Sequence, residues 1–281
     1  MAERPSEAEL TQVAKGLGMV TIESTSRAGS GHPSSGLSAL EIVTSLYFGG
    51  VLRHDPQRPD WPDRDRFVLS KGHGCPVLYA ALAERGYFPR DWVNSLRRLD
   101  APLEGHPNML KVPGLEASTG SLGQGLSIAL GIALAARFDG RDYRVYALIG
   151  DGESDEGQVW EAAMTAAKYK VENLTAIVDR NLYQQTGATE EVMPALEPLA
   201  DKWSAFGWHV LEVDGHDYEA LFAAFEEVRN ISAQPQVIIA RTVKGHRVSL
   251  IEEDPGNKFH GIPLKPEEAE EAIRELQEKM G

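Results

Sequence analysis

Two loop segments of this chain carry residues suited to hold a metal ion and a phosphate. Residues 150–152 read Gly-Asp-Gly, and Asn181 lies further along the chain. The Asp151 carboxylate and the Asn181 amide oxygen are hard ligands of the kind that Mg²⁺ or Ca²⁺ prefers. Gly150 and Gly152 have no side chain, so the backbone there can approach a phosphate closely. The two segments therefore predict a clamp for a metal ion and a diphosphate.

The elements around these loops would bring them together. Apolar runs at 145–149 and 174–178 each predict a buried parallel strand, and the stretch from about 156 to 169 between them predicts a helix. This order is a βαβ unit, in which two consecutive parallel strands end at the same edge of the sheet. Ligands of open α/β sheets bind at that edge, so we expect the clamp there.

The rest of the pattern predicts an α/β fold with a mostly parallel central sheet and helices on both faces. Further strands are expected at 66–70, 209–213 and 237–241. Further helices are expected at 6–24 with Ser6 as N-cap, 37–48, 76–85, 123–138, 195–206, 218–229 and 265–280. The helix at 123–138 is apolar on nearly all sides, so it should be buried in the core or at an interface.

We expect one domain over 1–264 and a charged helical tail over 265–281. A turn rich in Gly, Ser and Pro is expected at 27–36. Long irregular stretches are expected at 53–65, 99–119 and 242–263, and loops of that length in a compact domain are usually functional.

Composition excludes several classes of protein. The chain has 281 residues, of which 42% are hydrophobic and 25% are charged, as in soluble globular proteins. Its net charge of −14 argues against nucleic acid and anionic membranes as partners. An anionic ligand would therefore need a cation or local donors. Cys75 is the only cysteine, and neither a signal core nor a membrane-length apolar span is evident, so a cytoplasmic location is expected.

Four histidines lie beside glycine in loop-forming segments: His32, His73, His106 and His260. One such histidine would more often be structural than functional, but their recurrence favours a shared site. A neutral imidazole can donate to a phosphate oxygen and titrates near physiological pH, which suits phosphate binding and proton transfer. Structural or surface roles are expected for the remaining histidines, which are His54, His209, His216 and His246.

The chain resembles the transketolase family from about residue 13 to residue 264. The motifs that carry the resemblance occur in the family's order: Ser-Gly-His-Pro at 30–33, Ser-Lys-Gly-His-Gly at 70–74, Gly-His-Pro at 105–107, Gly-Ser-Leu-Gly-Gln-Gly at 120–125, Gly-Asp-Gly-Glu at 150–153, Asn181, and His-Gly-Ile-Pro-Leu at 260–264. The resemblance implies that the cofactor is thiamine diphosphate, bound through Mg²⁺, with Ca²⁺ or Mn²⁺ as alternatives.

The resemblance also implies roles for individual residues. The expected metal ligands are Asp151, Asn181 and the carbonyl of Tyr183. The expected cofactor contacts are His73, Gly120, Leu122, Gly150, Asp151, Gly152, Glu153, Asn181 and His260. The expected catalytic and substrate-channel residues are His32, His73, His106, His260 and Glu156. Glu156 resembles a glutamate in a carboxylate network that joins the two active sites of a dimer.

The residues alone leave plainer interpretations open. Asp151 is also compatible with an acid at a helix N-terminus, Asn181 with a turn residue, and Glu156 with a solvated carboxylate. The sequence also departs from the family at 182–187, which reads Leu-Tyr-Gln-Gln-Thr-Gly, and at Asn108, where the family often has glutamate. These departures concern the packing beside the expected metal site and the substrate rim.

Only the first of the three transketolase domains is recognisable here. In the family, the glutamate that protonates the pyrimidine ring and most sugar-phosphate contacts lie on the second domain. The lone chain should therefore not turn over. We expect the N-terminal subunit of a split transketolase, which transfers a two-carbon ketol unit between sugar phosphates when joined by a separate C-terminal subunit, in an α2β2 assembly.

Other functions remain open at this point. A split relative could act on an unusual sugar or a sulfosugar, because specificity lies mostly on the other subunit. The α subunit of a 2-oxo-acid dehydrogenase and a relative of deoxyxylulose-phosphate synthase are further enzyme alternatives. The histidine motifs disfavour the former, and the missing second domain disfavours the latter. Outside the enzymes, the chain could be a cofactor-binding regulatory remnant, although a remnant has no physical reason to keep the intact clamp.

Overall fold

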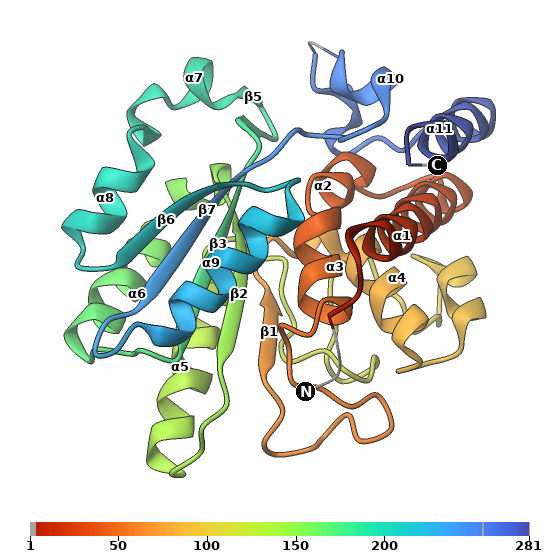
Figure 1. Cartoon of the computed structure of the whole chain (residues 1–281). Coiled ribbons are helices and arrows are strands. Elements are labelled where there is room, and N and C mark those ends of the chain that lie inside the picture. Colours follow the sequence, from red (N-terminus) through yellow and green to blue (C-terminus); the bar gives the residue numbers. More distant parts are fainter. Residues whose placement is uncertain (1–3, 255, 281) are drawn as a thin grey trace.

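A five-stranded parallel sheet forms the centre of the molecule (Figure 1). The computed structural model describes residues 4–254 and 256–280. The strand order is β1 (Arg66–Leu69), β2 (Val145–Gly150), β3 (Leu174–Arg180), β7 (Gln236–Arg241) and β6 (His209–Asp214). Two short strands, β4 (Tyr183–Gln184) and β5 (Gly187–Ala188), form a separate antiparallel hairpin. The α/β fold with a parallel sheet is confirmed.

The βαβ unit at the centre of the sheet is as predicted. Helix α6 (Gly157–Lys168) connects β2 to β3, and these strands pair in parallel with Gly150 opposite Asp179. The loops that follow the two strands therefore leave the same edge of the sheet. The β2 side chains alternate between the two hydrophobic cores, with Val145, Ala147 and Ile149 in one and Tyr146 and Leu148 in the other.

Helices cover both faces of the sheet (Figure 1). One face is covered by α5 (Gln124–Phe138), α6 and α8 (Leu199–Ala205). The other face is covered by α1 (Glu7–Ala28), α3 (Leu40–Phe48), α4 (Cys75–Arg85) and α9 (Tyr218–Asn230). Helix α11 (Pro266–Lys279) packs on α1, and Gly18 lets the Leu276 side chain approach the α1 backbone closely.

Short elements complete the chain. Two further α-helices are α7 (Thr189–Val192) and α10 (Ser249–Glu252). Short 3₁₀ helices cover Gly72–Gly74, Arg90–Ser95, Gly152–Asp155, Pro194–Leu196 and Lys258–His260. Helix α1 begins after Ser6, which forms the expected N-cap within a capping box.

One predicted turn is partly helical. Helix α2 (Pro33–Leu37) overlaps the segment 27–36, for which the sequence predicts a turn, and α3 begins at Leu40 rather than at residue 37. All five residues of α2 are buried, so tertiary packing stabilises a sequence whose Ser and Gly content disfavours helix. Pro33 at the helix start has a backbone already suited to that position.

Helix α5 is buried on one side only. Its buried residues are Gly125, Leu126, Ala129, Leu130, Ala133 and Ala136. The opposite side exposes Ile128 and Phe138, and the Phe138 side chain is 88% exposed. Within this chain the helix is therefore half covered, so of the two predicted alternatives it is not buried entirely in the core of this chain, and burial at an interface stays a prediction.

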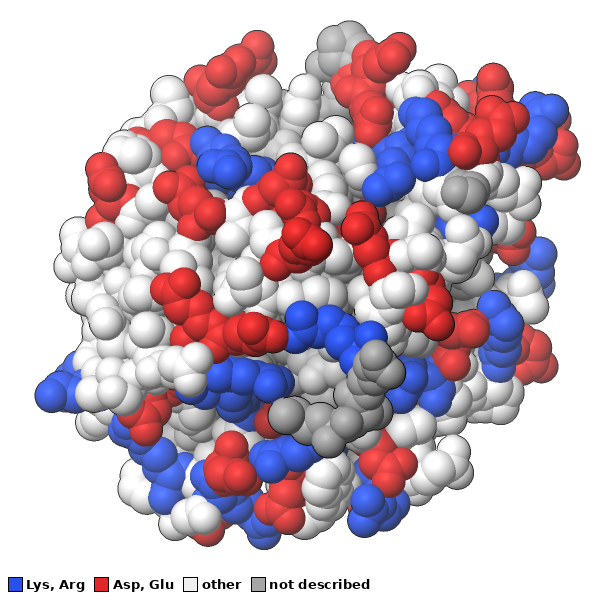
Figure 2. Space-filling view, in the orientation of Figure 1, with Lys and Arg blue, Asp and Glu red and all other residues white. Residues whose placement is uncertain are grey.

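The surface shows no basic patch in the view of Figure 2, where acidic and basic side chains are interleaved. Among the helices of the described residues, none combines the length and the apolar character that crossing a membrane requires.

Candidate functional site

A cavity of about 410 Å³ opens at the carboxyl edge of β2 and β3. Every residue that the sequence predicted for the site lines it: His32, His73, His106, Gly120, Leu122, Gly150, Asp151, Gly152, Glu153, Glu156, Asn181, Tyr183 and His260. These residues come from several segments that are far apart in the sequence. The structure therefore brings the whole predicted set into one place, which is the geometry that a shared ligand requires.

The predicted clamp is a buried carboxylate at the end of β2. Asp151 is 2% exposed, and it accepts the N–H groups of Gly152 at 2.8 Å and Leu182 at 2.6 Å. Leu182 has a φ of +65°, a left-handed conformation that costs a residue with a side chain about 1–3 kcal/mol. This turn brings Asn181 and Tyr183 beside Asp151 in the wall of the cavity.

Charge in the clamp is uncompensated. Burial, reinforced by the negative charge of Asp179, raises the pKa of the Asp151 carboxyl to about 7. Among the described residues, Asp151 forms no ion pair, so a cation bound beside it would supply the missing counter-charge. The donor set of one carboxylate, one amide oxygen and one backbone carbonyl is the oxygen chemistry that Mg²⁺ and Ca²⁺ take.

Glu153 joins the loops around the cavity. Its carboxylate accepts the N–H groups of Gly123 at 2.9 Å and Gly150 at 3.0 Å, and it also accepts the Ser70 hydroxyl. The residue thus fixes the end of β2 to the start of α5. Gly123 has a φ of +81°, and a Cβ on it would lie 2.8 Å from the Glu156 Cβ. Glycine at this position therefore allows Glu156 to lie against the start of α5.

The four glycine-flanked histidines form one cluster. The His32 ring centroid lies 5.1 Å from that of His73, 6.4 Å from that of His106 and 5.4 Å from that of His260. Burial and then the Arg97 guanidinium lower the pKa of His32 to about 4. Burial and then Lys244 lower the pKa of His260 to about 3. Both imidazoles are therefore neutral at pH 7.

The pKa values of the other two histidines in the cluster are lowered as well. Burial is the main reason that the pKa values of His73 and His106 also lie below their ordinary value. Four neutral imidazoles can each donate one hydrogen bond and accept another. Such a cluster can hold hydroxyl groups and pass protons without adding charge to the cavity.

Lys244 is a cavity residue for which the sequence gave no role. Its Nζ lies 2.6 Å from His260 Nδ1, within hydrogen-bond distance. Burial and then Lys71 lower the pKa of Lys244 to about 7. An anion in the cavity would favour the protonated amine and raise that pKa again.

A second feature that the sequence did not reveal is a buried ion pair under the cavity. Lys71 donates to Asp179, which is also bonded by the hydroxyls of Ser38 and Thr242. Both charged side chains are almost fully buried. An aspartate in an apolar strand must be paired, which is a signal that sequence reading could have used, but its partner could not be found that way.

The hairpin β4–β5 closes one side of the cavity. Gln184, Gln185 and Thr186 line it, and the Asn257 side chain donates to the Gln184 carbonyl at 2.7 Å. A Cβ on Gly152 would lie 2.5 Å from the Gln184 Cβ, so only glycine fits between the hairpin and the clamp. The segment that departs from the family pattern therefore contacts the predicted diphosphate loop directly.

The cavity also contains polar atoms that await a partner. Among the described residues, His32 Nδ1 and Gln184 Oε1 are buried and form no hydrogen bond. Buried polar atoms are usually satisfied, and unsatisfied ones in a cavity wall fit a polar ligand. Together with the uncompensated Asp151 and the glycine-only approach at residue 152, they fit a diphosphate with its metal ion.

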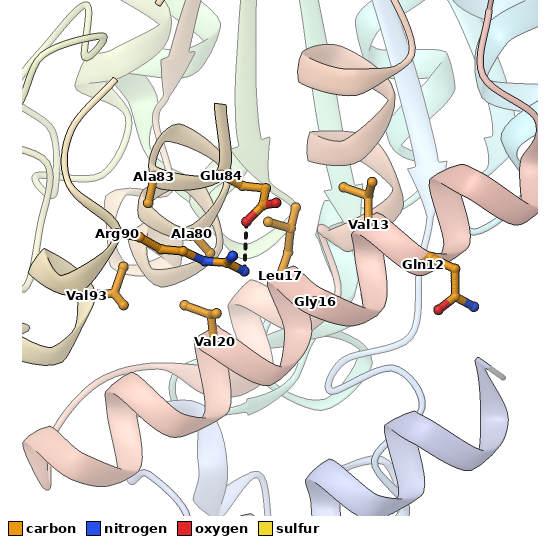
Figure 3. Close-up of a pocket in the computed structure, with 10 residues that line it drawn as sticks. All are labelled: Gln12, Val13, Gly16, Leu17, Val20, Ala80, Ala83, Glu84, Arg90 and Val93. Carbon is orange, nitrogen blue, oxygen red and sulfur yellow. Dashed lines mark ion pairs between the residues drawn. The ribbon is translucent and has the colours of Figure 1, made fainter. Parts of the chain in front are cut away.

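A separate cavity of about 270 Å³ lies between α1 and α4 (Figure 3). Its lining is mostly aliphatic, and the Arg90–Glu84 ion pair, at 2.8 Å, lies among these side chains. Of the residues that the structure describes, neither a histidine nor an acidic cluster lines it. This cavity therefore lacks the side chains that acid–base or metal chemistry would need.

Comparison with known proteins places this geometry in a family. Residues 10–281 match the family model described as "Transketolase, thiamine diphosphate binding domain". The sequence is 44% identical to the 6-deoxy-6-sulfo-D-fructose transketolase subunit SqwG of Clostridium sp. (strain MSTE9), over 92% of this chain and 93% of that protein. It is 43% identical to one subunit of the apulose-4-phosphate transketolase of Phocaeicola vulgatus, over 92% of this chain and 90% of that protein.

A solved structure agrees with the sequence comparisons. Transketolase from Campylobacter jejuni superposes with a TM-score of 0.90 at 32% identity. The match covers 99% of this chain but only 43% of the Campylobacter chain. This chain therefore spans less than half of that transketolase, whereas it spans nearly the whole of the two subunits.

Proposed function

Since the chain belongs to the transketolase family, we propose that it is the diphosphate-binding subunit of a two-subunit transketolase, which transfers a two-carbon ketol unit between sugar phosphates. The proposal rests on the share of each relative's length that this chain matches. The relatives that match over nearly their whole length are named as subunits, whereas the chain spans only 43% of a solved transketolase. This also favours the transketolase alternatives over a 2-oxo-acid dehydrogenase subunit.

The residues of the cavity fit thiamine diphosphate held by Mg²⁺. Asp151, Asn181 and the Tyr183 carbonyl would bind the metal ion, with Ca²⁺ or Mn²⁺ as alternatives. Backbone at Gly152 and the side chains of His73 and His260 would contact the diphosphate. Gly120, Leu122, Gly150 and Glu153 would complete the contacts with the cofactor or its loops. When bound, the cofactor supplies the nucleophilic carbon of ketol transfer.

The histidines would serve the sugar. His32, His73, His106 and His260 would donate to sugar hydroxyls and move protons, because neutral imidazoles can do both. Glu156 lies exposed at the cavity, where it could bond with a second copy of the site. These assignments follow the geometry and the family resemblance together.

A partner subunit would cover the exposed side of α5. Ile128 and Phe138 on α5 and Met164 on α6 are exposed apolar side chains, and α5 packs beside α6. Exposed apolar side chains grouped on neighbouring helices are typical of protein interfaces. We propose that a C-terminal subunit carrying the pyrimidine-binding half and a second copy of this chain bury this surface in an α2β2 assembly.

The test is ketol transfer with and without the partner. The chain alone should show no turnover with fructose 6-phosphate as donor, because the pyrimidine-binding half is absent, whereas the reconstituted pair should be active and Mg²⁺-dependent. The partner alone is the matched control. Substantial turnover by the lone chain would contradict the two-subunit proposal.

A second substrate class has its own support. One relative is named for 6-deoxy-6-sulfo-D-fructose and another for apulose 4-phosphate. We therefore propose that the donor is a ketose with a terminal anionic group, either phosphate or sulfonate. Comparing kcat/KM of the reconstituted pair for fructose 6-phosphate and for 6-deoxy-6-sulfofructose separates the two, and a preference for an uncharged ketose would contradict both.

A further inference from the structure

A buried glutamate and a histidine outside the cavity contact the loop that carries Lys244. Glu41 on α3 is fully buried, and its Oε2 lies 2.8 Å from His216 Nδ1. The other nitrogen of the same ring, His216 Nε2, accepts the backbone N–H of Val243 at 2.9 Å. The imidazole thus bridges a helix on one face of the sheet and the residue directly before Lys244.

These two contacts fix the protonation of His216. Because a backbone N–H can only donate, His216 Nε2 must carry a free lone pair. The single proton of the neutral ring then lies on Nδ1, where the Glu41 carboxylate accepts it. A doubly protonated ring would have no acceptor for Val243, so the bridge exists only in this one tautomer.

The position of Lys244 depends on few contacts of its loop. Thr242 is bonded to Asp179, and the Gly245 N–H donates to the Ser34 carbonyl at 3.1 Å. Between them, the Val243 side chain is 44% exposed, so packing does little to fix this residue, and its carbonyl accepts the His246 N–H at 3.2 Å. The hydrogen bond to His216 therefore holds the backbone from which the Lys244 side chain enters the cavity.

The same residues could be taken for a metal site, since ligand atoms of Glu41, His216 and His246 all lie within 4.8 Å of one another. A metal-bound histidine usually donates its other ring N–H to an acceptor. Here the other nitrogen of His216 faces an N–H donor, and His246 Nε2 likewise accepts from Arg247 Nε at 3.0 Å. The hydrogen bonds therefore favour a structural role over a metal site. We call the contacts that run from Glu41 through His216 to the Val243 backbone the relay.

We propose that Glu41 and His216 act as positioning residues that hold the Val243 backbone and thereby keep Lys244 beside His260 in the cavity. The relay rests on the proposed function only in that Lys244 would serve the bound diphosphate. The link from Glu41 to Val243 is a feature of the chain itself.

Two measurements on the full chain test the relay directly. In ¹⁵N-histidine-labelled protein, His216 should be neutral with its proton on Nδ1. The substitution His216→Phe keeps a ring that can stack on His246, whose centroid lies 3.5 Å away, but removes both nitrogens. Amide hydrogen exchange at Val243 should then be faster by about 2- to 12-fold, which is the effect of one neutral hydrogen bond.

His54→Phe is the matched control. His54 also bridges two groups, the Tyr87 hydroxyl and the Tyr47 carbonyl, and stacks on a ring, but it lies outside the cavity and the Val243 loop. Exchange at Val243 should not change in that variant. Glu41→Gln keeps an acceptor for the Nδ1 proton, so it should preserve the tautomer and the protection of Val243.

Binding of magnesium pyrophosphate, measured by calorimetry, links the relay to the cavity. His216→Phe should weaken it by a similar factor, and His54→Phe should not. A proton on His216 Nε2, unchanged Val243 exchange in folded His216→Phe, or Zn²⁺ binding that displaces the Val243 bond would overturn the relay. If wild type bound no magnesium pyrophosphate, the proposed cofactor site would fail, while the tautomer and exchange data would still decide on the relay.

Discussion

Removing the Lys71 ammonium should strongly destabilise the chain. Lys71 is 1% exposed and its partner Asp179 is 0% exposed, so water cannot solvate either charge when its partner is removed. In Lys71→Met, the Asp179 carboxylate would retain only the hydroxyls of Ser38 and Thr242 as donors. Breaking a buried ion pair from one side costs about 3–5 kcal/mol, because a buried charge is left uncompensated.

That cost translates into a measurable shift. For chains of this size, 1 kcal/mol corresponds to about 2–4 °C in the unfolding midpoint, so Lys71→Met should lower it by about 6–20 °C. Urea unfolding followed by circular dichroism gives the free energy of unfolding and its denaturant slope. Lys168→Met, at an exposed lysine, is the control and should stay within about 0.5 kcal/mol of wild type.

The double variant tests whether charge is the cause. In Lys71→Met/Asp179→Asn the uncompensated carboxylate is gone, so the loss should be smaller than the sum of the two single losses by about 0.5–3 kcal/mol. Strict additivity, or a loss in Lys71→Met below about 1 kcal/mol with an unchanged denaturant slope, would refute the reasoning.

The free energies of unfolding of wild type and Lys71→Met should respond to acid in opposite directions. Burial raises the pKa of Asp179, but Lys71 and two hydroxyl donors outweigh it, so the pKa lies below its ordinary value. Wild type therefore loses this contribution as pH falls through that lowered pKa. In Lys71→Met burial should dominate and raise the pKa, so this variant should regain stability on acidification. The stability difference between the two proteins should therefore shrink as pH falls from about 7 towards about 5.

Three further outcomes follow from single positions. Asp151→Ala should abolish Mg²⁺-dependent pyrophosphate binding, measured by calorimetry. Asp155→Ala, at an exposed carboxylate that lines the same cavity, should retain this binding. Equal binding by the two variants would contradict the predicted clamp. Gly125→Ala should cost about 1–3 kcal/mol in urea unfolding, because its Cβ would lie 2.4–2.6 Å from neighbouring atoms, whereas Gly131→Ala, in open space on the same helix, should gain about 0.5–1 kcal/mol. Burial raises the pKa of the Cys75 thiol to about 12, so a thiol reagent should label it only in urea; labelling of the folded chain would show that the segment opens.

The sequence could place the site because its residues follow strand ends. Asp151 and Asn181 each come directly after an apolar run, and parallel pairing of consecutive strands brings such loops together whatever the details of packing. The histidine motifs differ, because their glycines mark loops but only His73 follows a strand of the sheet. His32, His106 and His260 line the same cavity, and their family resemblance rather than the strand order predicted this.

Side-chain pairing could not be predicted in the same way. Lys71 and Asp179 lie 108 positions apart, and Glu41 and His216 lie 175 positions apart, so only the packed tertiary structure shows that they meet. Helix α2 was missed for a related reason, because burial outweighs the weak propensity of its residues. The apolar pattern of α5 likewise predicts that the helix is buried. It does not show whether this chain or a partner subunit supplies the covering surface.

If the cavity binds a divalent ion and a diphosphate as proposed, the charges around it couple the two binding events. Lys71 is neutralised by Asp179, and Lys244 is disfavoured as a cation by its burial. The cavity wall nevertheless contains Asp151, Glu153 and further acidic side chains in a chain of net charge −14. A diphosphate alone would therefore meet repulsion, whereas a divalent ion held at Asp151 would reverse the local sign, and the bound anion would favour the protonated form of Lys244. Under the proposed function, metal and diphosphate should for this reason bind cooperatively, and each should bind poorly without the other.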